Sequence, residues 1–130
     1  MLTPDQFHVN QALIVMRVND SFLFVQNEPY DIFVLMDAAS TFVLGNVLSR
    51  VVDEAPSEHD VKDLFKQAWG AKHEWAKQII ITEHSKAEEV FIKEAKRNGM
   101  TVRTIPLPEL EPIVGPLKES FASDFMGDIT

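Results

Sequence analysis

The sequence contains no cysteine, only five glycines and a single tyrosine, and it has fewer basic than acidic residues. The absence of cysteine excludes a disulfide framework and any zinc site built on thiolates. With 12 Lys and Arg against 20 Asp and Glu, the net charge is -8. Non-specific binding to nucleic acid is driven by Lys and Arg at phosphate groups, so this charge disfavours nucleic acid as a partner.

Several motifs and segments are also missing. The few glycines form neither a dinucleotide-binding nor a phosphate-binding loop, and no serine lies in a Gly-x-Ser-x-Gly elbow. No hydrophobic run is long enough to span a bilayer, so we expect no membrane association. The first ten residues lack the pattern of a secretory signal, which together with the absent cysteines predicts a cytoplasmic protein.

Hydrophobic residues make up 45% of the 130 residues, which fits one globular domain covering residues 1–130. Residues 12–25 are apolar around the turn signal Asn19-Asp20-Ser21, which predicts a hairpin, although residues 13–16 also fit a helix. A second pair of strands is expected at residues 31–36 and 41–47, joined by a turn at residues 37–40.

The second half of the chain alternates helices and strands. Ser57 can cap a helix that ends at Gly70, with Trp69 on its core face, and Ser85 with Glu88 forms a capping box for a helix that ends at Asn98-Gly99. Strands are expected at residues 78–82 and 101–105, and a last helix begins at Pro116. This order predicts an α/β domain with a mixed sheet flanked by helices.

The stretches DIFVLMDAASTFVLGNVLS and IIITEH, followed by a closing helix that carries Glu119, occur in this order over residues 31–125. In order and spacing they resemble integrase and transposase catalytic cores of the ribonuclease H-like superfamily. They also resemble a bacterial group that keeps this fold without its chemistry. The resemblance implies a ribonuclease H-like core at residues 31–125, with residues 1–30 as an N-terminal hairpin or extension.

In that family an Asp ends the first strand, a second Asp ends the fourth, and a Glu lies on a later helix. The matching positions here are Asp37, Glu83 and Glu119. If the three carboxylates converge, they would bind Mg2+ or Mn2+ and act as the catalytic and metal residues of a nuclease or strand-transfer domain. Convergence requires that the strands ending at Met36 and Thr82 lie side by side.

The residues also allow a simpler interpretation without a cofactor, which we favour. Asp37 can accept backbone hydrogen bonds in its turn. Glu83 comes shortly before the Ser85 cap, where its negative charge stabilises the N-terminus of the helix. The protein is then a non-catalytic interaction or regulatory module. The segment 13–24 contains more apolar surface than a lone hairpin can bury, so we expect a homodimer that covers it. A third hypothesis is a small-molecule pocket at the strand ends near Glu83 and His84.

Basic residues offer one further candidate site. A local strip for nucleic acid would have to use residues of the second half of the chain: Lys86, Lys93, Lys96, Arg97 and Arg103. The middle three fall in the last turns of a predicted helix, where positive charge complements the helix dipole. We therefore interpret them as helix-stabilising residues.

Overall fold

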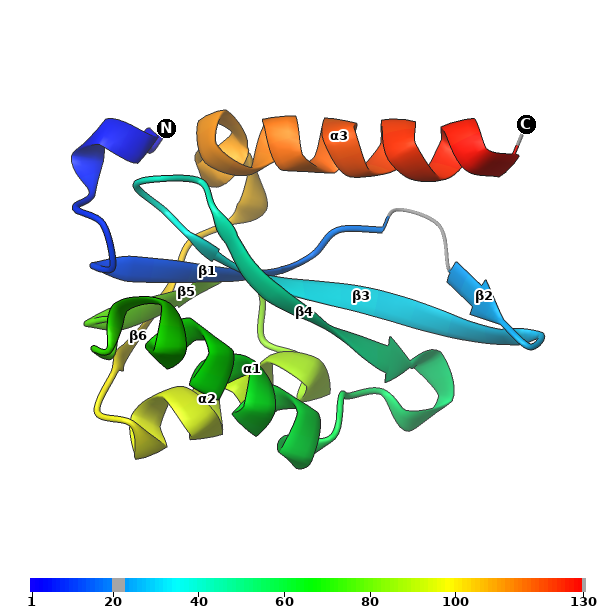
Figure 1. Cartoon of the computed structure of the whole chain (residues 1–130), viewed down its shortest axis with the longest axis horizontal. Coiled ribbons are helices and arrows are strands. Elements are labelled where there is room, and N and C mark those ends of the chain that lie inside the picture. Colours follow the sequence, from blue (N-terminus) through cyan, green and yellow to red (C-terminus); the bar gives the residue numbers. More distant parts are fainter. Residues whose placement is uncertain (20–22, 130) are drawn as a thin grey trace.

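A computed structural model describes residues 1–19 and 23–129, and for residues 122–129 it describes the backbone alone. A six-stranded sheet is flanked by three α-helices (Figure 1). The main strand order is β4-β3-β1-β5-β6, and the short β2 also pairs with β3. The strands are β1 (Ala12–Arg17), β2 (Leu23–Val25), β3 (Glu28–Asp37), β4 (Val43–Arg50), β5 (Gln78–Ile81) and β6 (Thr101–Thr104). The α-helices are α1 (Glu58–Lys72), α2 (Lys86–Arg97) and α3 (Glu111–Ile129), and 3-10 turns are η1 (Pro4–Gln6), η2 (Val51–Asp53) and η3 (Leu107–Leu110).

The N-terminal strands do not form the expected hairpin over residues 12–25. Both β1 and β2 pair antiparallel with β3, one after the other, and residues 20 and 21 of the expected turn lie outside the described residues. The hairpin turn lies instead at Gln26 and Asn27, which both have positive φ angles (51° and 69°), as a two-residue type I′ turn requires. The strand β1 is thus central in the sheet and not an addition to it.

Asn19 follows β1 and holds it against β3 where backbone pairing stops. Its Nδ2 donates to the Tyr30 carbonyl at 3.1 Å, and its Oδ1 accepts from the Ile32 N–H at 2.9 Å. The side chain is 4% exposed, so these bonds satisfy a buried amide that would otherwise destabilise the fold. The Asn19 side chain thereby replaces backbone hydrogen bonds between the two strands.

The strand β4 forms the edge of the sheet beside β3, as the pair of strands at 31–36 and 41–47 predicted. The pairing shifts at Leu35 and Met36, where β4 has a bulge. Gly45 faces α1 so closely that an added Cβ would lie 2.6 Å from Leu64 Cδ1. A side chain at this position would therefore displace the side-chain ends of Leu64 and Gln67.

The β5-α2-β6 unit confirms the strand-helix-strand prediction, because β5 and β6 are parallel. Ser57 accepts a hydrogen bond from the Asp60 N–H at 3.1 Å, and Ser85 with Glu88 forms the expected capping box. The helix α1 continues through Gly70 and ends at Lys72, and the capping residue His73 has a φ of 56°, in the left-handed region. Gly70 therefore does not stop the helix as expected.

Two apolar layers hold the sheet. One lies between the sheet and α1 with α2, and it contains Leu13, Val15, Ile79 and Ile81; the other lies under α3 and η3, and it contains Ile14 and Ile80. The alternation along β1 and β5 thus buries both faces, which explains their unbroken apolar sequences. Each fully buried Leu or Ile contributes about 1.5–3 kcal/mol through removal from water.

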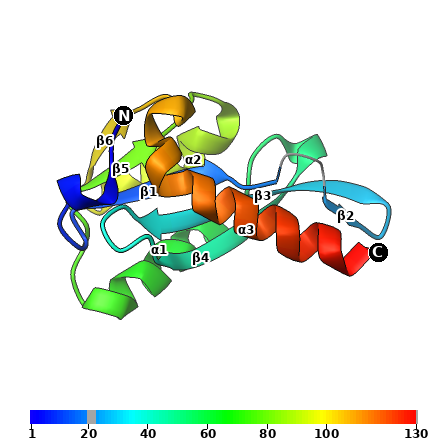
Figure 2. The ribbon, with the colours of Figure 1, turned by 90° about the horizontal axis from the view of Figure 1, so that it is seen from above.

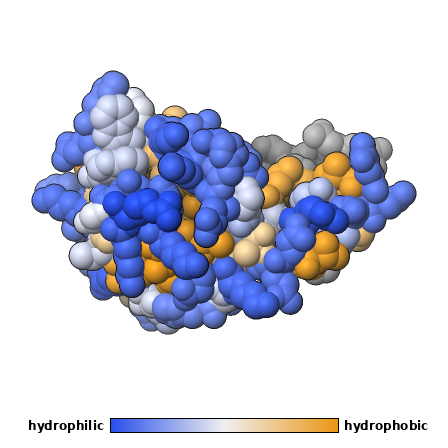
Figure 3. Space-filling model, turned by 90° about the horizontal axis from the view of Figure 1, so that it is seen from below, coloured by the Kyte–Doolittle hydropathy of each residue, from blue (hydrophilic) through white to orange (hydrophobic). Residues whose placement is uncertain are grey.

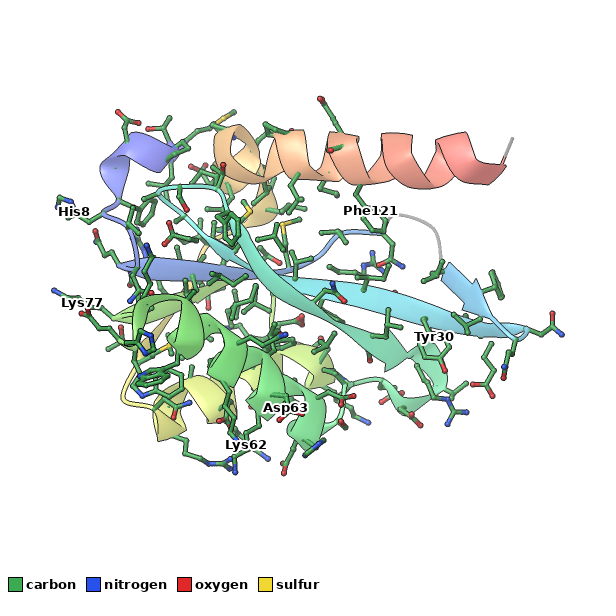
Figure 4. The ribbon with its side chains drawn as sticks, in the orientation of Figure 1. His8, Tyr30, Lys62, Asp63, Lys77 and Phe121 are labelled. Carbon is green, nitrogen blue, oxygen red and sulfur yellow. The ribbon has the colours of Figure 1, made fainter. Side chains whose placement is uncertain are left out.

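The helix α3 lies across the face of the sheet opposite α1 and α2 (Figures 1 and 2). It begins at Glu111, five residues earlier than expected, and contains Pro116 within its first turns. Leu117 and Phe121 pack against the apolar layer under the helix. Figure 4 shows Phe121 between α3 and the sheet. In the described part of the chain, no helix has both the length and the apolar character needed to span a membrane.

Candidate functional site

Asp37 ends β3 and is the most buried of the three predicted site residues. Its side chain is 4% exposed. Oδ1 accepts from the Asn10 N–H at 2.8 Å, and Oδ2 accepts from the Ser40 N–H at 2.8 Å and from Ser40 Oγ at 2.7 Å. The carboxylate therefore ties the loop before β1 to the β3–β4 turn, which is the structural role that an Asp at a turn commonly has.

The backbone around Asp37 is equally well bonded. Its N–H donates to the Phe42 carbonyl at 2.9 Å, and its carbonyl accepts from the Thr41 N–H at 2.9 Å. Thr41 and Asn10 have positive φ angles of 61° and 63°, which cost energy in residues other than glycine. The hydrogen bonds of Asp37 hold both of these residues in place.

Glu83 lies two residues beyond β5, is exposed, and is not near Asp37. Leu13 at the start of β1 pairs with Asp37 on one side and with Ile79 on the other. Asp37 is therefore level with the start of β5, whereas Glu83 lies past its end. The expectation that the two acids end neighbouring strands is wrong, because β1 lies between β3 and β5 and runs antiparallel to β3.

Glu119 lies on α3 and is exposed. Among residues 1–19 and 23–129, no group of three His, Cys, Asp or Glu side chains is arranged to hold a metal ion. Asp37, Glu83 and Glu119 thus do not fit a shared Mg2+ or Mn2+, and no catalytic step through a metal follows from this arrangement.

The strand order explains the mismatch. The resemblance implies an Asp at the end of the first strand, and the strand that lies parallel to β5 is β1, not β3. The sequence of β1, Ala12–Arg17, contains no acidic residue. Asn19, two residues later, is buried and bonded to β3. The sequence did not reveal that Asn19 bonds to β3. It showed only an asparagine after an apolar run, which is typical of a turn.

The carboxyl ends of β5 and β6 carry Glu83, His84 and Thr104. His84 Nε2 lies 2.8 Å from Thr104 Oγ1, so these two side chains join the ends of the parallel strands. A hollow of about 360 Å3 opens at the opposite end, beside Asp37 and Ser40, with Phe42 and Lys72 in its wall. The small-molecule pocket at Glu83 and His84 stays a prediction.

Trp69 is 40% exposed, so the expectation that it lies in the core is wrong. Its ring meets His73 edge-on with centroids 5.0 Å apart, and Trp75 lies 6.4 Å away. The helical stripe of buried residues in α1 runs through Ala68, and Trp69 is rotated by about 100° from it toward solvent.

The basic residues considered for nucleic acid are partly engaged with acids. Lys86 forms an ion pair with Glu54, and Arg97 forms one with Glu94 at 2.8 Å. The Glu54 carboxylate raises the pKa of Lys86, and Lys86 in turn lowers the pKa of Glu54, through their hydrogen bond and their charges. Lys96 and Arg97 lie in the last turn of α2, where their charge complements the helix dipole.

Comparisons with known proteins found no matching family model and no matching curated protein. Several solved structures are similar in fold, and two of them are retroviral. One chain belongs to a simian T-cell lymphotropic virus intasome in complex with PP2A regulatory subunit B56 gamma, with a TM-score of 0.53 and 18% identity. The similarity covers 95% of this chain but only 43% of that one.

The other is the HTLV-2 integrase catalytic core domain in complex with magnesium, in a dimeric form. Its TM-score is 0.52 at 14% identity, and the similarity covers 95% of this chain and 75% of that chain. At such identities the likeness establishes the fold alone. The chain therefore has the integrase-like, ribonuclease H-like α/β fold.

Proposed function

We propose that this domain is a non-catalytic interaction or regulatory module with an integrase-like fold. One observation carries the proposal: Asp37, the buried carboxylate among the three candidates, accepts three hydrogen bonds from the surrounding loops. A carboxylate used in this way supports a structural role, and Glu83 lies at the other end of the sheet. Fold similarity alone does not imply shared chemistry.

The test is a calorimetric titration with Mn2+. We expect no heat of binding that depends on the acidic residues, so wild type, Asp37→Asn and Glu83→Gln should give the same trace. Mn2+ binding that Asp37→Asn or Glu83→Gln removes would overturn the proposal and favour the metal-dependent nuclease or strand-transfer domain. Thermal unfolding of each variant, measured in parallel, separates loss of binding from loss of folding.

A homodimer forms part of this proposal. In the segment 13–24 that first suggested it, Leu13 to Met16 are buried within the domain, whereas Phe24 is 65% exposed. Val52, near the same β2–β3 end, is 67% exposed. Figure 3 shows apolar atoms reaching the surface at this end. One integrase core with this fold is described in a dimeric form.

Light scattering tests the dimer. Wild type should dimerise with rising concentration, and Phe24→Ser should shift the equilibrium toward monomer. Lys93→Ser, an exposed change on α2, is the control. Monomer alone at high concentration would reject the dimer.

The cellular and partner assignments remain part of the same proposal. A cytoplasmic location rests on the absence of cysteine, and the expectation that nucleic acid is not a partner rests on the net charge of -8. A filter-binding assay with DNA and RNA at physiological salt should detect no retention. Retention that falls steeply with salt would contradict the charge argument.

A further inference from the structure

The outer edge of β4 is open to another strand. Ile32 accepts from the Val18 N–H at 3.0 Å and donates to Asn19 Oδ1, so its backbone groups point toward β1. Because alternate residues of a strand bond to opposite sides, Phe33 bonds to β4, where it faces Val47. Asn46 and Leu48 therefore turn their N–H and C=O groups to the outer edge, where no strand pairs with them in the described part of the chain.

A hollow of about 420 Å3 runs beside this edge, between β4 and α1. Its floor on β4 is Asn46, Val47 and Leu48, and its wall on α1 includes Asp60, Asp63 and Gln67. These wall residues recur every three or four positions, so they form one side of the helix. Strand edge and helix side together make a groove, which we call the β4 groove.

The charges of α1 are divided between its sides. Asp60 and Asp63 line the β4 groove, whereas Lys62 and Lys66 do not. Around the helix, Lys62 is rotated by about 100° and Lys66 by about 60° from Asp63. Figure 4 shows Lys62 and Asp63 on the exposed surface of α1. Asp63 has His59 as a neighbour at 3.3 Å, and this histidine adds charge only when protonated. Both charged residues that line the groove are therefore acidic.

This charge pattern discriminates between possible occupants. A second copy that paired through the same edge would bring the two acidic walls together, and like charges at such an edge repel. A segment with alternating Lys or Arg would instead place its positive charges against Asp60 and Asp63. Strand addition of this kind takes affinity from main-chain hydrogen bonds and specificity from alternate side chains.

We propose that the β4 groove binds an extended basic segment of a partner protein, which adds to the sheet as a further strand. The inference rests on the proposed interaction function and names the kind of partner. Asn46 and Leu48 form the hydrogen bonds of the added strand, and Asp60 and Asp63 select basic side chains on the side that faces α1.

The probe is a capped decapeptide of alternating Lys and Val, titrated into 15N-labelled protein at low salt. We expect shifts of the Asn46 and Leu48 amides and slower exchange of their hydrogens. Asp60→Asn with Asp63→Asn should weaken binding by about tenfold, since two exposed ion pairs are lost together at low salt and each contributes a factor of a few. The matched control, Glu74→Gln with Glu89→Gln, removes the same charge from other surfaces and should change affinity by less than about twofold.

Two further arms separate strand addition from simple charge attraction. A peptide methylated on alternate backbone nitrogens keeps its charges but cannot form the ladder, so it should bind at least about tenfold more weakly. Leu48→Pro removes an outward N–H at an edge strand, and it should abolish the amide protection while the remaining spectrum stays native. Equal binding of the methylated peptide, or shifts located away from β4, would overturn the inference. The Mn2+ titration and light scattering do not involve this edge, so their outcomes remain separate.

Discussion

The two ends of the sheet differ in how their polar residues are used. At the Asp37 end, a buried carboxylate joins two loops through three hydrogen bonds. At the Glu83 end, the acid is exposed, and a single side-chain contact links His84 to Thr104. An acidic residue after an apolar strand can thus either join two loops through buried hydrogen bonds or lie exposed at the surface. The sequences around the two residues do not distinguish these roles, because burial depends on strand order.

The largest effect should come from Asp37→Ala. The variant leaves the N–H groups of Asn10 and Ser40 without their buried acceptor, and we expect a loss of about 3 kcal/mol in the free energy of unfolding. Urea denaturation followed by circular dichroism measures it. Glu83→Ala, at the other end, should change stability by less than about 0.5 kcal/mol. Equal losses in both variants would abolish the distinction between the two ends.

Asn19→Ala should have the next largest effect. It removes the side chain that bonds to Tyr30 and Ile32, and we expect destabilisation of about 2 kcal/mol because a buried N–H loses its acceptor. The control is Asn46→Ala, an exposed amide on β4, with an expected change below about 0.5 kcal/mol. Hydrogen exchange at the Ile32 amide should accelerate in Asn19→Ala alone. Unchanged exchange there would show that the amide is protected by other means.

The contact between His84 and Thr104 should contribute little. Both side chains are exposed, so a double-mutant cycle of His84→Ala and Thr104→Val should give a coupling energy of about 0.5 kcal/mol. A coupling above about 2 kcal/mol would mean that this end is as well organised as the Asp37 end.

The smallest effect concerns the ion pair between Glu54 and Lys86, at the start of α2. Lys86 lowers the pKa of Glu54 below its ordinary value of 4.5, so the pair contributes stability above that pH and loses it as pH falls through the lowered pKa. Lys86→Ala should return the pKa of Glu54 toward 4.5. A carboxyl NMR titration measures this, with Lys93→Ala as the control. An unchanged Glu54 pKa would show that Lys86 does not interact with Glu54 in solution.

Local signals in the sequence predicted much of the fold. Ser57 and Ser85 mark helix starts because their side chains cap backbone N–H groups of the first turn. Gly99 marks a helix end because glycine, without a side chain, readily adopts a positive φ angle. The strand expected at 78–82 is present, and its apolar run at 79–81 contributes to both core layers, as a strand covered on both faces requires. These properties depend on residues close together in the chain, which explains why they can be read from it.

The site could not be predicted in the same way. Whether Asp37 meets Glu83 depends on the strand inserted between β3 and β5, and that pairing joins residues far apart in sequence. Asn19-Asp20-Ser21 has the composition of a turn, but the hairpin turn among the described residues lies at Gln26-Asn27, which has weaker local signals. Taking residues 31–36 as the first strand then shifted the matching acid to the wrong position in the sheet.

Gly45 has a consequence for recognition as well as for packing. With hydrogen in place of a side chain, Gly45 leaves room for the side-chain ends of Leu64 and Gln67 of α1. An added methyl group would displace these ends, which line the β4 groove, and so alter the room available to an added strand. A residue without a side chain can thus help to determine which partner segments fit beside β4.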